Sequence, residues 1–473
     1  MALAKRQRIS LAVVAGVNAA LWIVPSQVVE QIARDRHTML GRYSRTHFAW
    51  IVGVFLVSLA AVYLITSTGE KYKRRWFQLI AALIVIAPSL VVADFLLHTP
   101  ARRHYIREGV LHHHPPLAEF HRRFEDKPEA YRTYPNAKPG YGSVDCTLRT
   151  DRRGYRNRTD LDRYDVVVLG DSFAEGSGVS DEQAWPGFLA AESGLSVYNL
   201  GMSGYSPVQY LASLREIGLS LKPRFVVCLL FEGNDFRSSA KDADEALPSW
   251  SDRLGAYFKQ SPLLGALDGA IIRTFGPINA TGPVRGGEVL DWMPLSIPDG
   301  SRARHYAFAP KQLRDLYKSR EEFAGSGKWL AVRYQLEGMR DACSQADCRL
   351  VVAYAPTAAH VLLPLVADRL SAEKVRAFTA LDYDKKLPDA EEFWRNLRER
   401  LDARASVVRA WCAEQSLLFV DLSQPLRAAA DGGTQVYYTY DQHWTPDGHA
   451  VVARTFVAIL SERRSPASGQ AAP

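Results

Sequence analysis

The sequence predicts an α/β fold built on a parallel β-sheet and preceded by N-terminal membrane-spanning helices. Two observations carry this prediction. Short apolar runs alternate with helix-like stretches over 165–461, which is typical of a parallel sheet covered by helices on both faces. Three longer apolar stretches open the chain, and each is long enough to cross a hydrocarbon layer of about 30 Å.

The expected membrane region covers 1–98 and contains three spans, at 9–29, 48–66 and 76–97. The second stretch carries no charge, and the third is apolar until Asp94, near its end. The basic start at Lys5, Arg6 and Arg8 would also suit a signal peptide. The long apolar core, with no small-residue cleavage site after it, favours an uncleaved anchor.

Charge distribution and cysteine spacing argue against some classes of function. The net charge of +7 is not gathered into one basic tract with interleaved aromatics, which argues against nucleic-acid binding. Basic residues divide evenly between the two sides of the predicted spans, so charge alone does not set the orientation. None of the five cysteines has zinc-ligand spacing, and we expect neither a metal nor a cofactor. Cys343 and Cys348 could form a disulfide or be two buried thiols.

After the membrane region we expect a linker and domain lead-in at 99–160, a catalytic domain at 161–462 and a flexible tail at 463–473. Within the lead-in, His112-His113-His114 lies in a Pro- and Arg-rich stretch and is interpreted as a solvated run. Two insertions, at about 237–324 and 358–389, contain Gly, Pro and aromatic residues that are typical of lids or substrate-binding loops.

The predicted secondary structure of the catalytic domain alternates throughout. Strands are predicted at Asp165–Leu169, Val197–Leu200, Phe225–Leu230, Leu350–Tyr354 and Leu417–Asp421. Helices are predicted at Ala184–Ser193, Pro207–Leu219, Lys328–Gln345, Glu391–Gln415 and Gly448–Ser461. Since parallel strands deliver their carboxyl ends to one edge, functional side chains are expected just after these strands.

Ser172 follows the first predicted strand in the sequence Gly170-Asp171-Ser172-Phe173 and precedes a helix-like stretch. Such a serine can be a plain helix cap. It can also be a nucleophile, because backbone N–H groups at a helix start can receive a developing oxyanion. A serine nucleophile further needs a base and a group that orients the base.

Candidates for these roles follow other strands. Gly204 lies in the glycine-containing loop after the second strand, and Asn234 follows the third. Asp441 and His443 precede the last apolar helix, where a histidine with a nearby carboxylate can act as an oriented base. Each motif alone would more often be an ordinary turn or surface loop.

Together these residues resemble the SGNH (GDSL-type) hydrolase superfamily, whose four blocks are matched in order by Ser172, Gly204, Asn234 and His443. The resemblance covers about 165–460 and implies a flavodoxin-like three-layer sandwich. It implies Ser172 as nucleophile and His443 as base. The oxyanion would be bound by the backbone N–H groups of Ser172 and Gly204 and by the Asn234 amide.

The last block departs from the common pattern. The superfamily usually has Asp-x-x-His, whereas this chain has Asp441-Gln442-His443 followed by Trp444. An Asp-x-His-Trp motif is similar to that of the alginate O-acetyltransferase-related group, although there the motif precedes the serine. Asp441 is therefore the expected orienting acid, with Asp447, a candidate helix cap, as a less favoured substitute.

The resemblance predicts a membrane-anchored extracytoplasmic serine esterase or O-acyltransferase that cleaves or transfers an acetyl ester on a carbohydrate or cell-surface glycan. The expected partners are that ester or glycan, the lipid bilayer and, for a transferase, a multi-span acyl-donor membrane protein. The alternative is a catalytically idle glycan-binding or scaffold protein of a polysaccharide-modifying complex.

Overall fold

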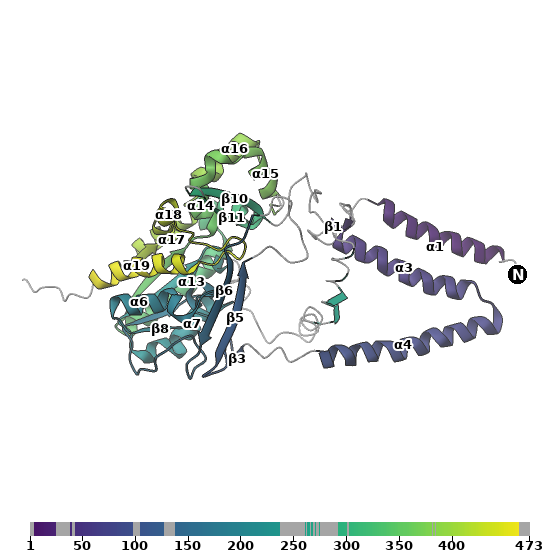
Figure 1. The fold of residues 1–473 in the computed structure, drawn as a ribbon, viewed down its shortest axis with the longest axis horizontal. Coiled ribbons are helices and arrows are strands. Elements are labelled where there is room, and N and C mark those ends of the chain that lie inside the picture. The colour runs from purple at the N-terminus through teal and green to yellow at the C-terminus, as the bar shows by residue number, and fades with distance from the viewer. Residues whose placement is uncertain are drawn as a thin grey trace, which may run out of the picture. The chain divides into compact units, whose positions relative to one another are not determined.

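The computed structural model describes residues 4–24, 38–39, 43–97, 105–126, 138–236, 292–299, 302–380, 382–383 and 385–462, with isolated residues between 261 and 274. The predicted tail and most of the first insertion lie outside these residues. The chain divides into two compact units (Figure 1). One contains the N-terminal helices, and the other contains the described residues of 105–236 and 292–462.

The N-terminal unit consists of helices α1 (Lys5–Ile23), α3 (Arg45–Ile65) and α4 (Gly69–Leu97), with the short strands β1 (Thr38–Met39) and β2 (Tyr43–Ser44). Within the described residues, two helical stretches are long and apolar enough to cross a membrane, His47–Ile65 and Gly69–Asp94. The expected first span is helical to Ile23, and its last residues lie outside the described part of the chain.

Side chains of this unit are consistent with an apolar environment. Val57 on α3 and Phe77 on α4 are 70% and 73% exposed, as are many of their apolar neighbours. Water would make this exposure unfavourable, whereas lipid would not. Polar side chains instead join α1 to α3: Asn18 Nδ2 donates to Ser58 Oγ at 2.7 Å, and Gln7 Nε2 to the Ile65 carbonyl at 2.6 Å.

The second unit contains the predicted parallel sheet, and all five predicted strands are confirmed. The strands are β7 (Val166–Leu169), β8 (Val197–Asn199), β9 (Phe225–Phe231), β12 (Arg349–Ala355) and β13 (Leu418–Asp421). Their spatial order is β13-β12-β9-β7-β8, with every neighbouring pair parallel. This is the flavodoxin-like order, in which ligands bind beyond the carboxyl ends of the strands where the chain direction across the sheet reverses.

Alternating side chains of the strands pack into two separate cores, one on each face of the sheet. Val166 and Val168 belong to one core together with Trp185 of α6 and Phe456 of α19, whose rings stack at 4.8 Å. Val167 and Leu169 belong to the other, with residues of α7, α13 and α17. The three-layer sandwich follows directly from this period-two alternation.

The helices of this unit connect and cover the strands (Figure 1). They are α5 (Ser172–Glu175), α6 (Trp185–Ser193), α7 (Pro207–Glu216), α11 (Pro310–Leu316), α12 (Arg320–Ala324), α13 (Gly327–Gln345), α14 (Ala358–Val366), α15 (Ala372–Ala380), α16 (Ala390–Glu399), α17 (Ala403–Glu414), α18 (Ser423–Asp431) and α19 (Pro446–Glu462). The single helix expected over Glu391–Gln415 is wrong, because α16 and α17 are separate. The break contains the buried Leu401 and the exposed Asp402. The Asp402 carboxylate contacts His360 Nε2 at 2.9 Å.

Among the described residues of this unit, three antiparallel hairpins lie outside the parallel sheet. They are formed by β3 (Ile106–Glu108) with β4 (Leu111–His113), β5 (Glu119–Asp126) with β6 (Gly142–Arg149), and β10 (Met293–Asp299) with β11 (Arg302–Phe308). The first two occupy the stretch expected to be a linker and lead-in. This stretch is therefore more ordered than its Pro- and Arg-rich composition indicates.

All five cysteines of the sequence are free and buried. Cys343 and Cys348 are neighbours whose side chains hydrogen-bond, and this contact, together with burial, raises the pKa of Cys343. Of the two alternatives left open by the sequence, the structure has the pair of buried thiols. They offer no support for an oxidising compartment.

Candidate active site

Ser172 begins the short helix α5 on a tight turn after β7. The turn needs glycine at position 170, since a Cβ there would lie 2.6 Å from the Cβ of Ala174. Asp171 caps the helix by accepting a hydrogen bond from the Phe173 N–H at 2.9 Å. Asp171 and Phe173 are buried, whereas Ser172 between them is partly exposed at the carboxyl edge of the sheet.

His443 and Asp441 complete a hydrogen-bonded chain that begins at this serine. His443 Nε2 lies 2.7 Å from Ser172 Oγ, and His443 Nδ1 lies 2.5 Å from Asp441 Oδ1. The serine and the histidine are 271 positions apart in sequence. The three side chains therefore have the geometry of a nucleophile, a base and a group that orients the base.

The charges of the His443–Asp441 pair stabilise each other. Burial lowers the pKa of His443, but the hydrogen bond and charge of Asp441 outweigh it, so the pKa is raised. Burial raises the pKa of Asp441, yet the hydrogen bond and charge of His443 leave it lowered. An imidazole in this setting is favoured to accept a proton when a serine hydroxyl is deprotonated.

The backbone at Gln442 accounts for the unusual Asp-x-His spacing. Gln442 has φ of 73°, in the left-handed region that non-glycine residues rarely adopt. This conformation turns the chain so that Asp441 reaches both the ring and the backbone N–H of His443. The Gln442 side chain is held in place by a hydrogen bond from the buried Gln312 on α11. Asp447, the alternative acid, lies in the first turn of α19, while His443 Nδ1 is already occupied by Asp441.

A second carboxylate secures the loop that carries this pair. Asp126, at the end of β5, is buried and accepts hydrogen bonds from the backbone N–H groups of Thr439, Tyr440 and Asp441 at 2.7, 2.9 and 3.2 Å. It also accepts one from the Tyr141 N–H at 2.7 Å. No sequence motif marks this residue, because its three partners in the catalytic loop lie more than 300 positions away.

We expect Asp126→Ala to reduce kcat/KM by about tenfold or more, because buried donors left without an acceptor cost about 1–3 kcal/mol each and loosen the loop. The measurement is ester hydrolysis alongside thermal unfolding. The matched control is His121→Ala, which replaces an exposed residue of the same strand. Wild-type activity and unfolding temperature in Asp126→Ala would contradict this role.

Asn234 and Gly204 lie on the turns after β9 and β8, beside the serine turn. Asn234 Nδ2 donates to Asp171 Oδ2 at 2.8 Å, which leaves the other amide N–H available, and its Oδ1 is buried without a partner among the described residues. Gly204 has φ of 83°, and its loop is joined to the serine turn by a 3.1 Å bond from the Met202 N–H to the Gly170 carbonyl. Both residues are therefore placed at the edge where an oxyanion would form.

Asp235 and His449, which lie near the site residues in sequence, have structural partners. Asp235 accepts hydrogen bonds from Tyr210 and the Phe231 N–H, and burial raises its pKa. His449 Nδ1 accepts a bond from the Trp185 N–H at 3.3 Å.

His360 on α14 is fully buried, and its ring nitrogens lie 3.1 Å from Glu232 and 2.9 Å from Asp402. Burial lowers the pKa of His360, but the Glu232 charge and the hydrogen bonds raise it to about 9. Glu232 lies in the turn just before Asn234, so this ion pair anchors the Asn234 turn rather than binding substrate.

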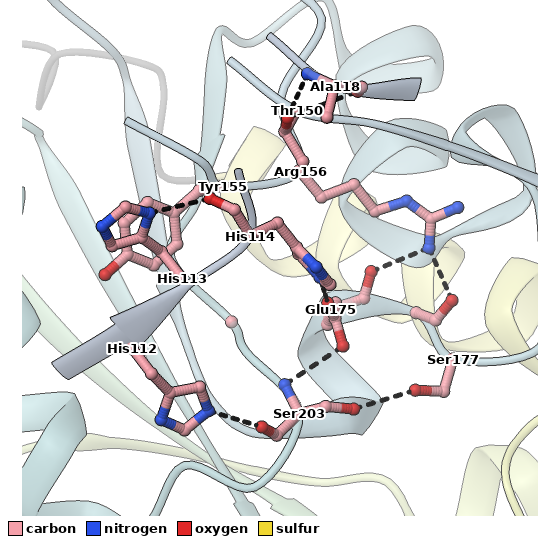
Figure 2. A network of polar contacts seen from close by, with 12 residues as sticks. His112, His113, His114, Ala118, Thr150, Tyr155, Arg156, Glu175, Ser177 and Ser203 are labelled. Carbon is pink, nitrogen blue, oxygen red and sulfur yellow. Dashed lines mark hydrogen bonds and ion pairs between the residues drawn. The ribbon is translucent and has the colours of Figure 1, made fainter. Parts of the chain in front are cut away.

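The histidine run is not solvated, contrary to expectation. His113 and His114 are buried, and His114 Nε2 lies 2.5 Å from Glu175 Oε1 on α5 (Figure 2). The other oxygen of Glu175 accepts a bond from the Ser203 N–H at 3.1 Å, while His112 Nε2 lies 2.9 Å from the Ser203 carbonyl (Figure 2). Burial opposes ionisation of Glu175, but the His114 contact prevails and lowers its pKa. The network holds the residue that precedes Gly204.

A pocket of about 270 Å³ opens beside His443 and Asp441. Its walls come from residues 175–179 at the end of α5 and just after it, from Ser203 and from the β5–β6 hairpin. The hairpin contributes Phe120, Arg122, Arg123, Phe124, Cys146 and Leu148. The sequence analysis missed these hairpin residues. The only available signal was the pair of phenylalanines four apart within a charged stretch, which does not by itself predict a strand.

The sheet order and the Ser172–His443–Asp441 chain define the class of protein as an SGNH-type serine hydrolase. A family model describing the GDSL-like Lipase/Acylhydrolase family matches residues 168–451, more than half of the chain. The chain belongs to this family.

Several solved structures are similar to the chain. TesA is 15% identical, with 63% of this chain and 98% of that chain covered and a TM-score of 0.30. A GDSL-like lipase from Bacteroides thetaiotaomicron is 13% identical, covering 65% and 93%, with a TM-score of 0.29. LAE5, an alpha/beta hydrolase from the metagenome of Lake Arreo, is 13% identical, covering 64% and 97%, with a TM-score of 0.31. No curated protein matches the chain.

Proposed function

We propose that the chain is a membrane-anchored serine esterase or O-acyltransferase that acts on an acetyl ester of a carbohydrate outside the cytoplasm. The observation that carries the chemistry is the 2.7 Å contact between His443 Nε2 and Ser172 Oγ, backed by Asp441. The two candidate spans, His47–Ile65 and Gly69–Asp94, support the membrane anchor. The carbohydrate and the extracytoplasmic setting are supported by the resemblance of the Asp-x-His-Trp motif.

In the first half of the reaction, His443 takes the proton of Ser172 Oγ as the oxygen attacks the ester carbonyl carbon. The carbonyl electrons move onto oxygen, where the N–H groups of Ser172 and Gly204 and the Asn234 amide stabilise the charge. The intermediate collapses, the carbon–oxygen bond to the alcohol breaks, and protonated His443 gives its proton to the departing oxygen. The acyl group remains on Ser172.

In the second half, His443 deprotonates an incoming hydroxyl as it attacks the acyl carbon, and Ser172 leaves with the proton returned by His443. Water as the acceptor makes the protein an esterase, whereas a sugar hydroxyl makes it a transferase. The site chemistry is the same for both. A transferase would draw its acyl group from a donor on the other side of the membrane through a multi-span partner.

The test uses the full chain in detergent with 4-nitrophenyl acetate, with and without a soluble oligosaccharide. Mass spectrometry of the quenched reaction should find an acetyl group on Ser172, and Ser172→Ala should lack it. Acetate in water selects the esterase, and acetylated oligosaccharide selects the transferase. Absence of both the acyl-enzyme and turnover would favour the idle binding protein.

Orientation needs a separate measurement. A pair of reporters fused after Pro473, one active only outside the cytoplasm and one active only inside, decides it. Activity of the cytoplasmic reporter alone would overturn the extracytoplasmic placement.

A further inference from the structure

The pocket beside His443 contains a positive charge that the proposed mechanism does not use. Arg122 lies in the middle of β5 and borders the pocket together with Phe120 and Phe124. Its guanidinium lies over the Phe120 ring, 5.4 Å from the ring centre. Its charge also lowers the pKa of Cys146, although burial dominates and leaves that pKa raised.

The pairing of β5 with β6 determines which hairpin side chains face the pocket. Phe120, Arg122 and Phe124 alternate along β5 and pair with Leu148, Cys146 and Val144 of β6. Because side chains alternate between faces and paired residues share a face, Arg122 lies on the side of the pocket-lining Phe120 and Cys146. Arg123, which pairs with Asp145, also borders the pocket and adds a second positive charge to its wall.

The charged groups of the pocket other than Arg122 and Arg123 already have partners. Asp441 is paired with His443, and Glu175 with His114. Arg156 is buried, and its guanidinium contacts Asp181 at 2.7 Å and several backbone carbonyls. Among the described residues, Arg122 forms no ion pair, and its side chain is exposed toward the pocket opening. The unbalanced charge at this pocket wall is therefore positive.

We propose that the pocket binds an ester substrate carrying an anionic oxyacid group, a carboxylate or a sulfate, and that Arg122 selects it. This inference rests on the proposed serine-ester chemistry. A guanidinium presents paired N–H donors that match two oxygens of such a group. Phe120 and Phe124 supply apolar surface for the ring or chain that bears the charge. With the ester carbon at Ser172 Oγ, the anion lies on the β5–β6 side of His443.

The experiment uses the full chain in an uncharged detergent and four esters of similar shape. 4-Acetoxybenzoate and 4-acetoxyphenyl sulfate are anionic, and methyl 4-acetoxybenzoate and 4-acetoxyanisole are their neutral counterparts. For the wild type we expect the KM of each anionic ester to be about 3- to 10-fold lower than that of its neutral counterpart. This factor corresponds to the free energy of a charge-assisted hydrogen bond that solvent exposure has weakened. Comparison of the two anions tells whether a carboxylate or a sulfate is preferred.

Arg122→Gln should abolish this preference, and Arg122→Lys should retain part of it, since lysine keeps the charge without the planar pair of donors. Arg398→Gln, which changes an exposed arginine on α16 that does not line the pocket, should keep the wild-type ratio. An equal loss in both glutamine variants, or no preference in the wild type, would overturn the inference. If Ser172→Ala leaves hydrolysis of the neutral esters intact, the proposed function fails instead, and the two failures are thereby distinguished.

Discussion

Replacing Ser172 or His443 by alanine is expected to lower kcat for ester hydrolysis by about 10⁴- to 10⁶-fold, because nucleophile and base act as one unit. For the same reason, the double variant should be no slower than the slower single variant. Each change removes a partly exposed side chain that the fold does not need, so the unfolding temperature should stay near the wild-type value. The measurement is initial-rate kinetics with 4-nitrophenyl acetate on all three variants.

The expected non-additivity of the two losses makes this prediction strict. Two losses that multiply in the double variant would mean that Ser172 and His443 act independently, which is incompatible with proton transfer over their 2.7 Å contact. His121→Ala, an exposed histidine outside the pocket, is the control for a general effect of losing an imidazole. It should leave kcat unchanged.

Asp441→Asn has the second-largest expected effect, a loss of about 10²- to 10⁴-fold in kcat/KM, together with a shift in its pH dependence. His443 must be neutral to accept the serine proton, so activity rises with pH through the His443 pKa. Asp441 raises that pKa, with burial acting against it. Removing the negative charge therefore moves the rise in activity to lower pH while reducing the plateau. The pH profile of kcat/KM, measured for both proteins, tests the direction.

Asp447→Asn is the matched control, because this carboxylate lies only six positions along and is exposed on α19. Its profile should coincide with that of the wild type. A normal profile in Asp441→Asn with a shifted one in Asp447→Asn would exchange the roles of the two acids. A shift to higher pH in Asp441→Asn would contradict the electrostatic explanation.

The parallel sheet and the positions that follow its strands could be predicted from the sequence. Buried strands of a parallel sheet are nearly continuous apolar runs, as in Val166–Leu169 and Phe225–Phe231, so they stand out from their surroundings. Polar residues just beyond them, Ser172 and Asn234, are then expected at the same edge.

Elements whose stability comes from distant partners could not be predicted in this way. Strand β5 contains five charged residues among its eight, so its sequence has no clear hydrophobic alternation. It forms because β6 pairs with it and the catalytic unit covers one of its faces. The buried His114 resembles any linker histidine until Glu175 is placed 2.5 Å away. The split of the predicted helix at Asp402 likewise depends on His360.

The sequence by itself was enough to predict the five strands of the sheet, the candidate nucleophile Ser172 and the candidate base His443. Local apolar patterning indicates the strands, and short motifs indicate the two side chains. Only the tertiary structure showed that Asp441 can orient His443 with one residue between them, because Gln442 adopts the left-handed conformation. It also showed that Asp126 holds the loop that carries Asp441 and His443. It alone brought Arg122 to the pocket. These features depend on contacts between segments up to about 300 positions apart, and hydrophobic periodicity carries no information about which distant groups will meet.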